Sequence, residues 1–339
     1  MWDHPCSMSQ LVRFTRQDCR HAAVGVIPAV VLIALGHLTA GVAFAIGLLP
    51  TSLMGIAPRR RVRVVFGIVG CLFGLGIFLG AVVFNTFDLV AAALVFFVVC
   101  FGATGVASLR PAGGVLLGIL IPALGVGTGY SIADAAALMV AFIAGSLWSC
   151  LVMLPVREFE PEGDVAERLS AMQPPHVKAY GMLLGLTAAS AILVGPVFDI
   201  PKPGWIATAA LLVIRPIQQM TGWRGVGRAL STIAGTVLVI VTLDLDLGYG
   251  ATAIICAVIT ILTIGARTSQ LYVTPFGTAF LILTIELYGV DNPDSFHPIG
   301  HARIVNNVLG ALIALFFGQL VSGLLERWYF APRARRAPS

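Results

Sequence analysis

Charged residues are scarce in this chain of 339 residues. Asp, Glu, Lys and Arg make up 11% of it, whereas 58% of the residues are hydrophobic. An ordinary soluble domain carries about a quarter charged residues. Water cannot cover that much apolar surface, so the composition excludes an ordinary soluble globular protein and predicts a membrane protein.

Motifs of catalysis and metal binding are also missing. The sequence has no G-x-x-x-x-G-K-[ST] loop for ATP, and neither G-x-S-x-G nor H-E-x-x-H. Its six cysteines form no C-x-x-C pair and are interpreted as packing residues. His297 and His301 are four residues apart, but Pro293 and Pro298 disfavour the helix that would pair them on a metal. We expect no enzyme activity, no metal and no cofactor.

Twelve apolar stretches fill most of the chain instead. A helix needs roughly 20 apolar residues to cross a hydrocarbon core. Stretches of about this kind lie at 21–37, 39–57, 64–84, 89–107, 112–129, 134–155, 179–198, 204–217, 229–245, 249–265, 271–289 and 304–325. The sequence therefore predicts an all-α membrane protein with about twelve transmembrane helices.

One long polar segment, 157–178, divides these stretches six and six. The predicted organisation is a cytoplasmic N-terminal segment, a first six-helix half, a cytoplasmic linker, a second six-helix half and a basic cytoplasmic tail, at 1–20, 21–156, 157–178, 179–325 and 326–339. Residues 1–20 lack the apolar run of a cleavable signal peptide, so none is expected.

The basic residues support this count. With the N-terminus placed inside, 19 of the 21 Lys and Arg residues fall on the cytoplasmic side, and only Lys202 and Arg303 fall outside. Cytoplasmic loops retain Lys and Arg, and one miscounted span would reverse every later loop. Both termini are therefore expected in the cytoplasm. Because the bases are dispersed over loops and not gathered on one face, no nucleic-acid binding is expected.

The two halves repeat each other weakly. At a constant offset of 165 residues, the aligned pairs are Arg59 with Arg224, Arg63 with Arg228, Gly70 with Gly235, and Gly145 with Gly310. Each half has an even number of spans, so both begin in the cytoplasm. The predicted arrangement is two parallel repeats about an axis along the membrane normal, with a binding site near their interface.

Arginines at the cytoplasmic ends of two spans are candidate substrate-binding residues. Arg59 and Arg63 precede the third span and Arg224 and Arg228 the ninth, four residues apart in each case and so on one helix face. Guanidinium groups suit carboxylate capture, and the four are predicted to line an inner vestibule. Topogenic charges that bind lipid phosphates would explain the same pattern.

Two further ionisable residues border apolar runs. Arg215 precedes Pro216, which interrupts a helix, so Arg215 is a candidate near the transport pathway. Snorkelling to the inner headgroups is the alternative. Glu286 lies in LILTIELYG, where burial would favour its protonated form, and is a candidate for proton coupling. An interfacial carboxylate is the alternative there.

The second half also carries two longer motifs and a tryptophan. They are Trp205, Arg224-x-x-x-Arg228-x-x-Ser231-Thr232-x-x-Gly235 and Arg303-Ile304-Val305-Asn306-Asn307-Val308-Leu309-Gly310, and the short LLVIRP run accompanies them. Over about 203–318 the chain thereby resembles the fusaric-acid-resistance-like (FUSC) family of bacterial inner-membrane proteins. That family typically shows R-x-x-x-R-x-x-G-T-x-x-G and R-I-x-D-T-L-x-G here. Ser231 replaces the first glycine, and Asn306 and Asn307 replace Asp-Thr, which removes an acid that could serve proton coupling.

This resemblance implies efflux of aromatic carboxylates or other amphipathic organic anions across the plasma membrane, driven by an ion gradient. A passive anion channel and a non-transporting scaffold or accessory subunit remain alternatives. Gly70, Gly235, Asn306 and Gly310 are interpreted as a helix-packing motif. The expected partners are small organic anions and the lipid bilayer, and a homo-oligomer and a periplasmic adaptor are left open.

Overall fold

A computed structural model describes residues 13–109, 113–159, 174–200, 204–214, 218–245, 247–269, 274–288, 296–321 and 323. These residues form helices and connections, and none of them lies in a strand. The first half contains α2 (Arg16–Gly25), α3 (Ile27–Ala34), α4 (Leu38–Leu53), α5 (Arg60–Thr86), α6 (Leu89–Leu109), α7 (Gly113–Gly127) and α8 (Ile132–Met153). The second half contains α10 (Pro174–Val197), α11 (Gly204–Val213), α12 (Gln218–Asp244), α13 (Tyr249–Gly265), α14 (Thr274–Tyr288), α15 (Phe296–Leu315) and the π-helical turn η2 (Phe316–Val321).

The all-helical prediction is confirmed, and each of the twelve expected stretches overlaps a helix. The first stretch is two helices, because the chain breaks at Val26 before Pro28 starts α3. With α2 and α3 counted together, six helices of the described residues are long and apolar enough to cross a membrane, and five shorter ones are apolar. Such a set is expected of a multi-pass membrane protein.

Large apolar side chains cover much of the exterior. Val90 and Leu94 of α6, Val140 of α8 and Ile254 of α13 are among the exposed hydrophobic residues. In water such a surface would aggregate. In a bilayer it contacts acyl chains, so the exterior agrees with the composition.

Glycines let neighbouring helices approach backbone to backbone. A Cβ added at Gly80 of α5 would overlap the carbonyl of Leu124 in α7, and one added at Gly127 would overlap the carbonyl of Ile77. Small residues at such crossings favour helix association in membranes, where the hydrophobic effect cannot drive it. The glycines of α5 therefore form the surface on which α7 and α8 pack, with Gly76 and Gly80 facing α7 and Gly67, Gly70 and Gly74 facing α8.

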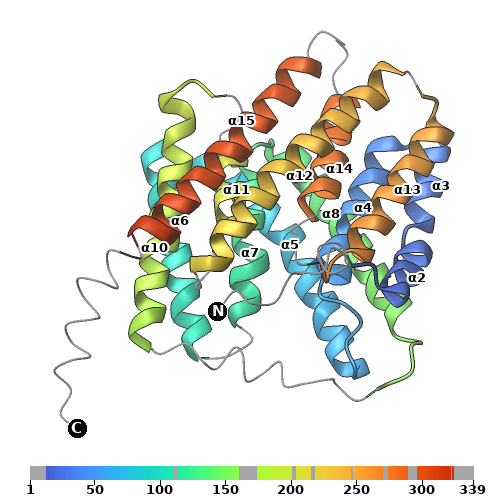
Figure 1. Ribbon diagram of the computed structural model, residues 1–339, viewed down its shortest axis with the longest axis horizontal. Helices are drawn as coiled ribbons and strands as arrows, with labels where there is room; N and C mark the ends of the chain where they lie inside the picture. Colours follow the sequence, from blue (N-terminus) through green and yellow to red (C-terminus); the bar gives the residue numbers. More distant parts are fainter. Residues whose placement is uncertain are drawn as a thin grey trace, which may run out of the picture.

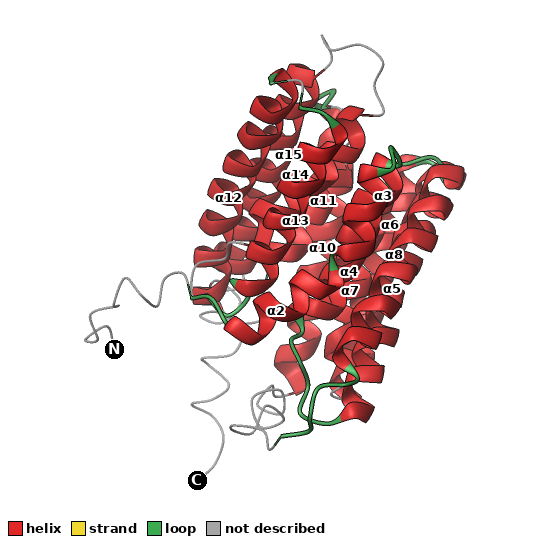
Figure 2. Ribbon diagram, turned by 90° about the vertical axis from the view of Figure 1, so that its right-hand side faces the viewer, coloured by secondary structure: helices red, strands yellow, loops and turns green. Residues whose placement is uncertain are grey.

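Contacts within the two halves correspond. In the first half α5 packs on α7 and α8, and α4 packs on α3 and α8; in the second α12 packs on α14 and α15, and α11 packs on α10 and α15. Across the halves, α6 packs on α10 and α7 on α11, whereas α13 packs on α2 and α3 and α14 on α4. Figures 1 and 2 show these helices running broadly along one direction. The parallel repeat stays a prediction.

Candidate functional site

A buried ionisable cluster lies where the first half meets the second. It consists of Tyr130, Trp205, Glu286 and Arg303, here called the Glu286 cluster. The Tyr130 hydroxyl donates a hydrogen bond of 3.2 Å to Oε1 of Glu286. The Arg303 guanidinium lies over the Trp205 ring, 4.2 Å from its centroid, and its charge interacts with Glu286. Because Glu286 is only 8% exposed and Arg303 only 4%, both charges are held away from solvent.

Tight turns position Tyr130 between α7 and α8. The amides of Thr128, Gly129 and Tyr130 donate to carbonyls three residues earlier, which winds the end of α7 into a compact connection. The Asn85 side chain donates to the Tyr130 carbonyl at 3.0 Å and ties this connection to α5. Ser131 then caps α8 by accepting from the Asp134 amide. Tyr130 is therefore a fixed residue of the first half.

Trp205 reaches the cluster because α11 begins against the same connection. A Cβ at Gly204 would overlap the Thr128 hydroxyl, so only glycine permits this approach. On the other side, a Cβ at Gly310 of α15 would overlap the Ile206 carbonyl, which brings α15 and Arg303 close to α11. Two glycine contacts thus bring the indole and the guanidinium together.

The cluster combines polar groups whose charges depend on one another. Burial, reinforced by the neighbouring Glu286 carboxylate, raises the pKa of the Tyr130 phenol well above its ordinary value, so the phenol stays a neutral donor. Nε of Arg303 has no hydrogen-bond partner among the described residues, although it is buried. Asn307 donates to the Arg303 carbonyl at 2.9 Å. Ionisable groups at membrane depth are costly and mark functional sites by default.

Comparison with known proteins bears on the same part of the chain. Residues 189–317 match the fusaric acid resistance protein-like family. The resemblance expected from the second half is confirmed over these residues, and the family is one of transporter-type membrane proteins. The matched region contains Trp205, Glu286 and Arg303, whereas Tyr130 lies outside it. No curated protein and no solved structure matches the chain.

Outside the FUSC-like region, Arg63 is completely buried. Its Nε donates to the Ala57 carbonyl at 2.6 Å, and its Nη1 and Nη2 donate to four further carbonyls, those of Met153, Val156, Pro58 and Arg157. A guanidinium has five N–H donors, so five backbone carbonyls occupy all of them. Arg63 joins the start of α5 to the end of α8 and keeps no donor for a carboxylate.

The other predicted arginines occupy different environments. Arg59 is exposed and has an extended backbone, because α5 begins only at Arg60. The i,i+4 rule therefore does not place Arg59 on one helix face with Arg63. Arg228 of α12 is buried. Arg215 and the side chain of Arg224 lie outside the described residues, so the four-arginine vestibule stays a prediction.

The predicted packing residues lie at helix crossings. A Cβ at Gly70 would overlap the hydroxyls of Thr51 and Ser146, and one at Gly235 would overlap the Phe276 carbonyl. Asn306 is fully buried in α15, one turn after Arg303. Gly70 thus joins α5 to α4 and α8, and Gly235 joins α12 to α14, the helix that contains Glu286.

A second polar network lies in the first half, and the sequence reasoning missed it. His21 of α2 is 3.2 Å from the Ser149 hydroxyl and 3.3 Å from that of Ser52, and the two hydroxyls are 2.9 Å apart. One turn earlier, Asp18 forms a 2.8 Å ion pair with Arg267. These contacts fix α2 to α4, α8 and the end of α13.

Proposed function

We propose that this protein exports aromatic or other amphipathic organic anions across the bacterial inner membrane, driven by an ion gradient. The observation that carries the proposal is the Glu286 cluster, because a buried carboxylate, phenol and guanidinium meet at the contact between the halves. The fusaric acid resistance protein-like match over residues 189–317 supports transport as the class of function.

In this proposal Glu286 is the proton site. While it is ionised, its charge attracts Arg303, and it accepts the hydrogen bond of Tyr130. Protonation neutralises the carboxylate and weakens both interactions. Tyr130 belongs to the first half and the other two residues to the second, so binding of a proton loosens the contact between the halves. A proton moving inward thereby drives the conformational change that exports an anion.

The substitution of the family's acidic residue fits this assignment. Asn306 stands where the family pattern has Asp, one turn along α15 from Arg303. The charge that acts on Arg303 comes from Glu286 on α14 instead. The chain thus keeps a carboxylate that acts on the arginine of this family motif, Arg303, although the carboxylate comes from another helix.

The proposed topology is twelve crossings in two parallel six-helix repeats, with both termini in the cytoplasm. The corresponding contacts of α5 and α12, and of α4 and α11, support it. Arg59, Arg215, Arg224 and Arg228 raise the local anion concentration at the cytoplasmic side. Arg63 is left out, since backbone carbonyls occupy its donors.

Inside-out proteoliposomes provide the test. Uptake of a labelled aromatic carboxylate is measured with and without an imposed pH gradient, for the unchanged protein and for Glu286→Gln. Coupled export predicts accumulation only with the gradient, and its loss in the variant. Equilibration that ignores the gradient would indicate a passive channel, and absence of flux for a series of carboxylates would favour a scaffold.

A further inference from the structure

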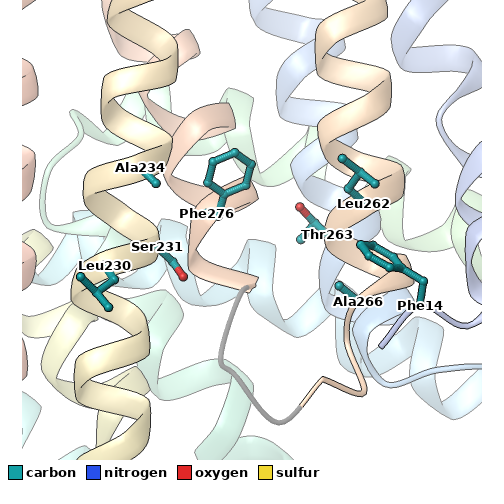
Figure 3. Close-up of a pocket in the computed structure, with 8 residues that line it drawn as sticks. All are labelled: Phe14, Leu230, Ser231, Ala234, Leu262, Thr263, Ala266 and Phe276. Atoms are coloured by element: carbon teal, nitrogen blue, oxygen red, sulfur yellow. The ribbon is translucent and has the colours of Figure 1, made fainter. Parts of the chain in front are cut away.

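A cavity of about 370 Å³ lies between α12 and α13, away from the Glu286 cluster. Figure 3 shows Ser231 and Ala234 on α12, Thr263 on α13, and Phe276 on the helix behind them. Small-molecule sites in proteins have volumes of roughly 300–1,000 Å³ and mostly apolar walls. The cavity meets both conditions.

The cavity exists because α12 and α13 both pack on α14 while making little contact with each other in the described part of the chain. Gly235 brings α12 onto the Phe276 carbonyl. Gly277 of α14 comes so close to Thr263 of α13 that an added Cβ would overlap its hydroxyl. The two glycine contacts hold α14 as the floor of a cleft whose walls are α12 and α13.

The mouth of this α12–α13 cleft is apolar and faces the exterior of the bundle. Leu230 is 60% exposed, Phe14 52% and Leu262 42%. Deeper in the cleft, Ser231 and Thr263 are buried. In a bilayer the exposed side chains contact acyl chains, so the cleft opens sideways into lipid.

Two arginines lie within one helical turn of cleft residues along the chain, on the side predicted to be cytoplasmic. Arg13 is exposed and adjoins Phe14, and its amide donates to the Ser269 hydroxyl just beyond α13. Arg228 precedes Ser231 by one turn on the buried face of α12. None of the eight lining residues carries a charge. An amphipathic anion would therefore place its apolar body in the cleft and its carboxylate toward these arginines.

We propose that aromatic monocarboxylates dissolved in the inner leaflet bind in the α12–α13 cleft before they are exported. The inference rests on the proposed function for the export step, but not for binding. Rings of Phe14 and Phe276 line the cleft from two separate segments, which favours an aromatic body. The cleft adds a recruitment site for substrates that partition into the membrane.

Photolabelling tests binding without any transport. Purified protein in lipid nanodiscs is labelled with 4-benzoylbenzoate, and the labelled peptides are mapped by mass spectrometry, with 1-naphthoate as competitor. Labelling is expected in the peptides that contain Leu230 and Leu262, and naphthoate is expected to suppress it. Labelling of other peptides instead would overturn the proposal. Labelling of these peptides that naphthoate does not reduce would also overturn it, because it would indicate unspecific contact or a site for acyl chains.

Two variants and a matched control sharpen the test. Ala234→Trp fills the cleft and is expected to weaken naphthoate binding at least about tenfold. Val237→Trp adds the same side chain three residues further along α12, where the residue is exposed and does not line the cleft, and should leave binding unchanged. Phe14→Ala removes an exposed ring and should weaken binding about two- to tenfold. If Ala234→Trp and Phe14→Ala bind naphthoate as tightly as the Val237→Trp control, the proposal is contradicted.

Transport then separates the two proposals. If the unchanged protein binds naphthoate in the cleft but moves no anion, the proposed function fails and the binding site stands. If the Ala234→Trp and Val237→Trp variants export anions at the same rate as the unchanged protein, the proposed export function is supported and recruitment through the cleft is contradicted. Recruitment from lipid also predicts a trend across substrates: the more strongly a substrate partitions into the membrane, the lower the aqueous concentration that gives half-maximal export.

Discussion

Arg63 and Arg303 are both buried arginines in helices, yet their surroundings differ completely. Five backbone carbonyls accept from the donors of Arg63, so their dipoles stabilise its charge and its geometry is fixed. Arg303 lies over an indole and interacts electrostatically with Glu286, a carboxylate that can change its charge, and its Nε has no hydrogen-bond partner among the described residues. Burial alone therefore does not identify a functional arginine. The groups that accept from its N–H donors distinguish a structural arginine from a functional one.

The largest expected effect is on stability, at Arg63. Arg63→Met would leave five carbonyls of the α5 start and the α8 end without their donor. Since an unsatisfied buried polar group costs about 1–3 kcal/mol, the loss should exceed about 3 kcal/mol and prevent accumulation of folded protein. Folded yield and thermal unfolding in detergent measure it. Exposed Arg59→Met is the control, and equal behaviour of the two variants would remove the structural role of Arg63.

Arg303 should show the opposite balance between stability and transport. Arg303→Met removes the charge that favours the ionised form of Glu286, so coupled export should be lost. The unfolding free energy should fall by less than in Arg63→Met, because Arg63 loses five hydrogen bonds. Adding Glu286→Gln should restore most of that stability but no coupled transport. A double-mutant cycle of unfolding free energy and export rate checks both. Additive stability effects would show that the two charges do not interact.

Tyr130→Phe removes the hydrogen bond to Glu286 and keeps the aromatic ring. Such a bond to a charged group contributes about 1.5–3 kcal/mol. Because the phenol stabilises the ionised carboxylate, its loss makes protonation easier, and the pH of half-maximal export should move upward. The pH profile of export in proteoliposomes measures the shift. A profile that coincides with that of the unchanged protein would separate Tyr130 from proton binding.

The smallest effect is expected at a third arginine, Arg267, which is partly exposed although its partner Asp18 is buried. Arg267 is 24% exposed on its side chain, so solvent weakens the pair. Asp18→Asn keeps an oxygen that can accept from Arg267, so it should cost only about 1 kcal/mol of unfolding free energy, with export unchanged. A shift in thermal unfolding as large as that of the Arg303 variant would contradict the ranking of the three arginines.

Hydropathy was sufficient to predict the helices, because every apolar stretch needs a hydrogen-bonded backbone in lipid. It also singled out Glu286, since an acid inside LILTIELYG stands out by local contrast. Tyr130 could not be found in this way. It is an ordinary residue in a short connection, and only the packing of α7 on α11 brings it to Glu286.

The environments of the arginines could not be predicted from their spacing. Spacing of four residues predicted that Arg59 and Arg63 would share a face, but the helix begins between them. Arg303 carried a usable signal, as one of only two bases on the outer side of the predicted topology. An exception to the positive-inside rule within a family motif deserved the same weight as the inner arginine pairs.

Proton movement in pyranine-loaded proteoliposomes tests the central claim most directly. A gradient of the transported anion is imposed, and the internal pH is followed for the unchanged protein, for Glu286→Gln, and for Asp244→Asn as an exposed-acid control. Glu286 as the proton site predicts anion-dependent proton movement in the unchanged protein and in Asp244→Asn, and its loss in Glu286→Gln while labelled anion still exchanges. Undiminished proton movement in Glu286→Gln would contradict the account.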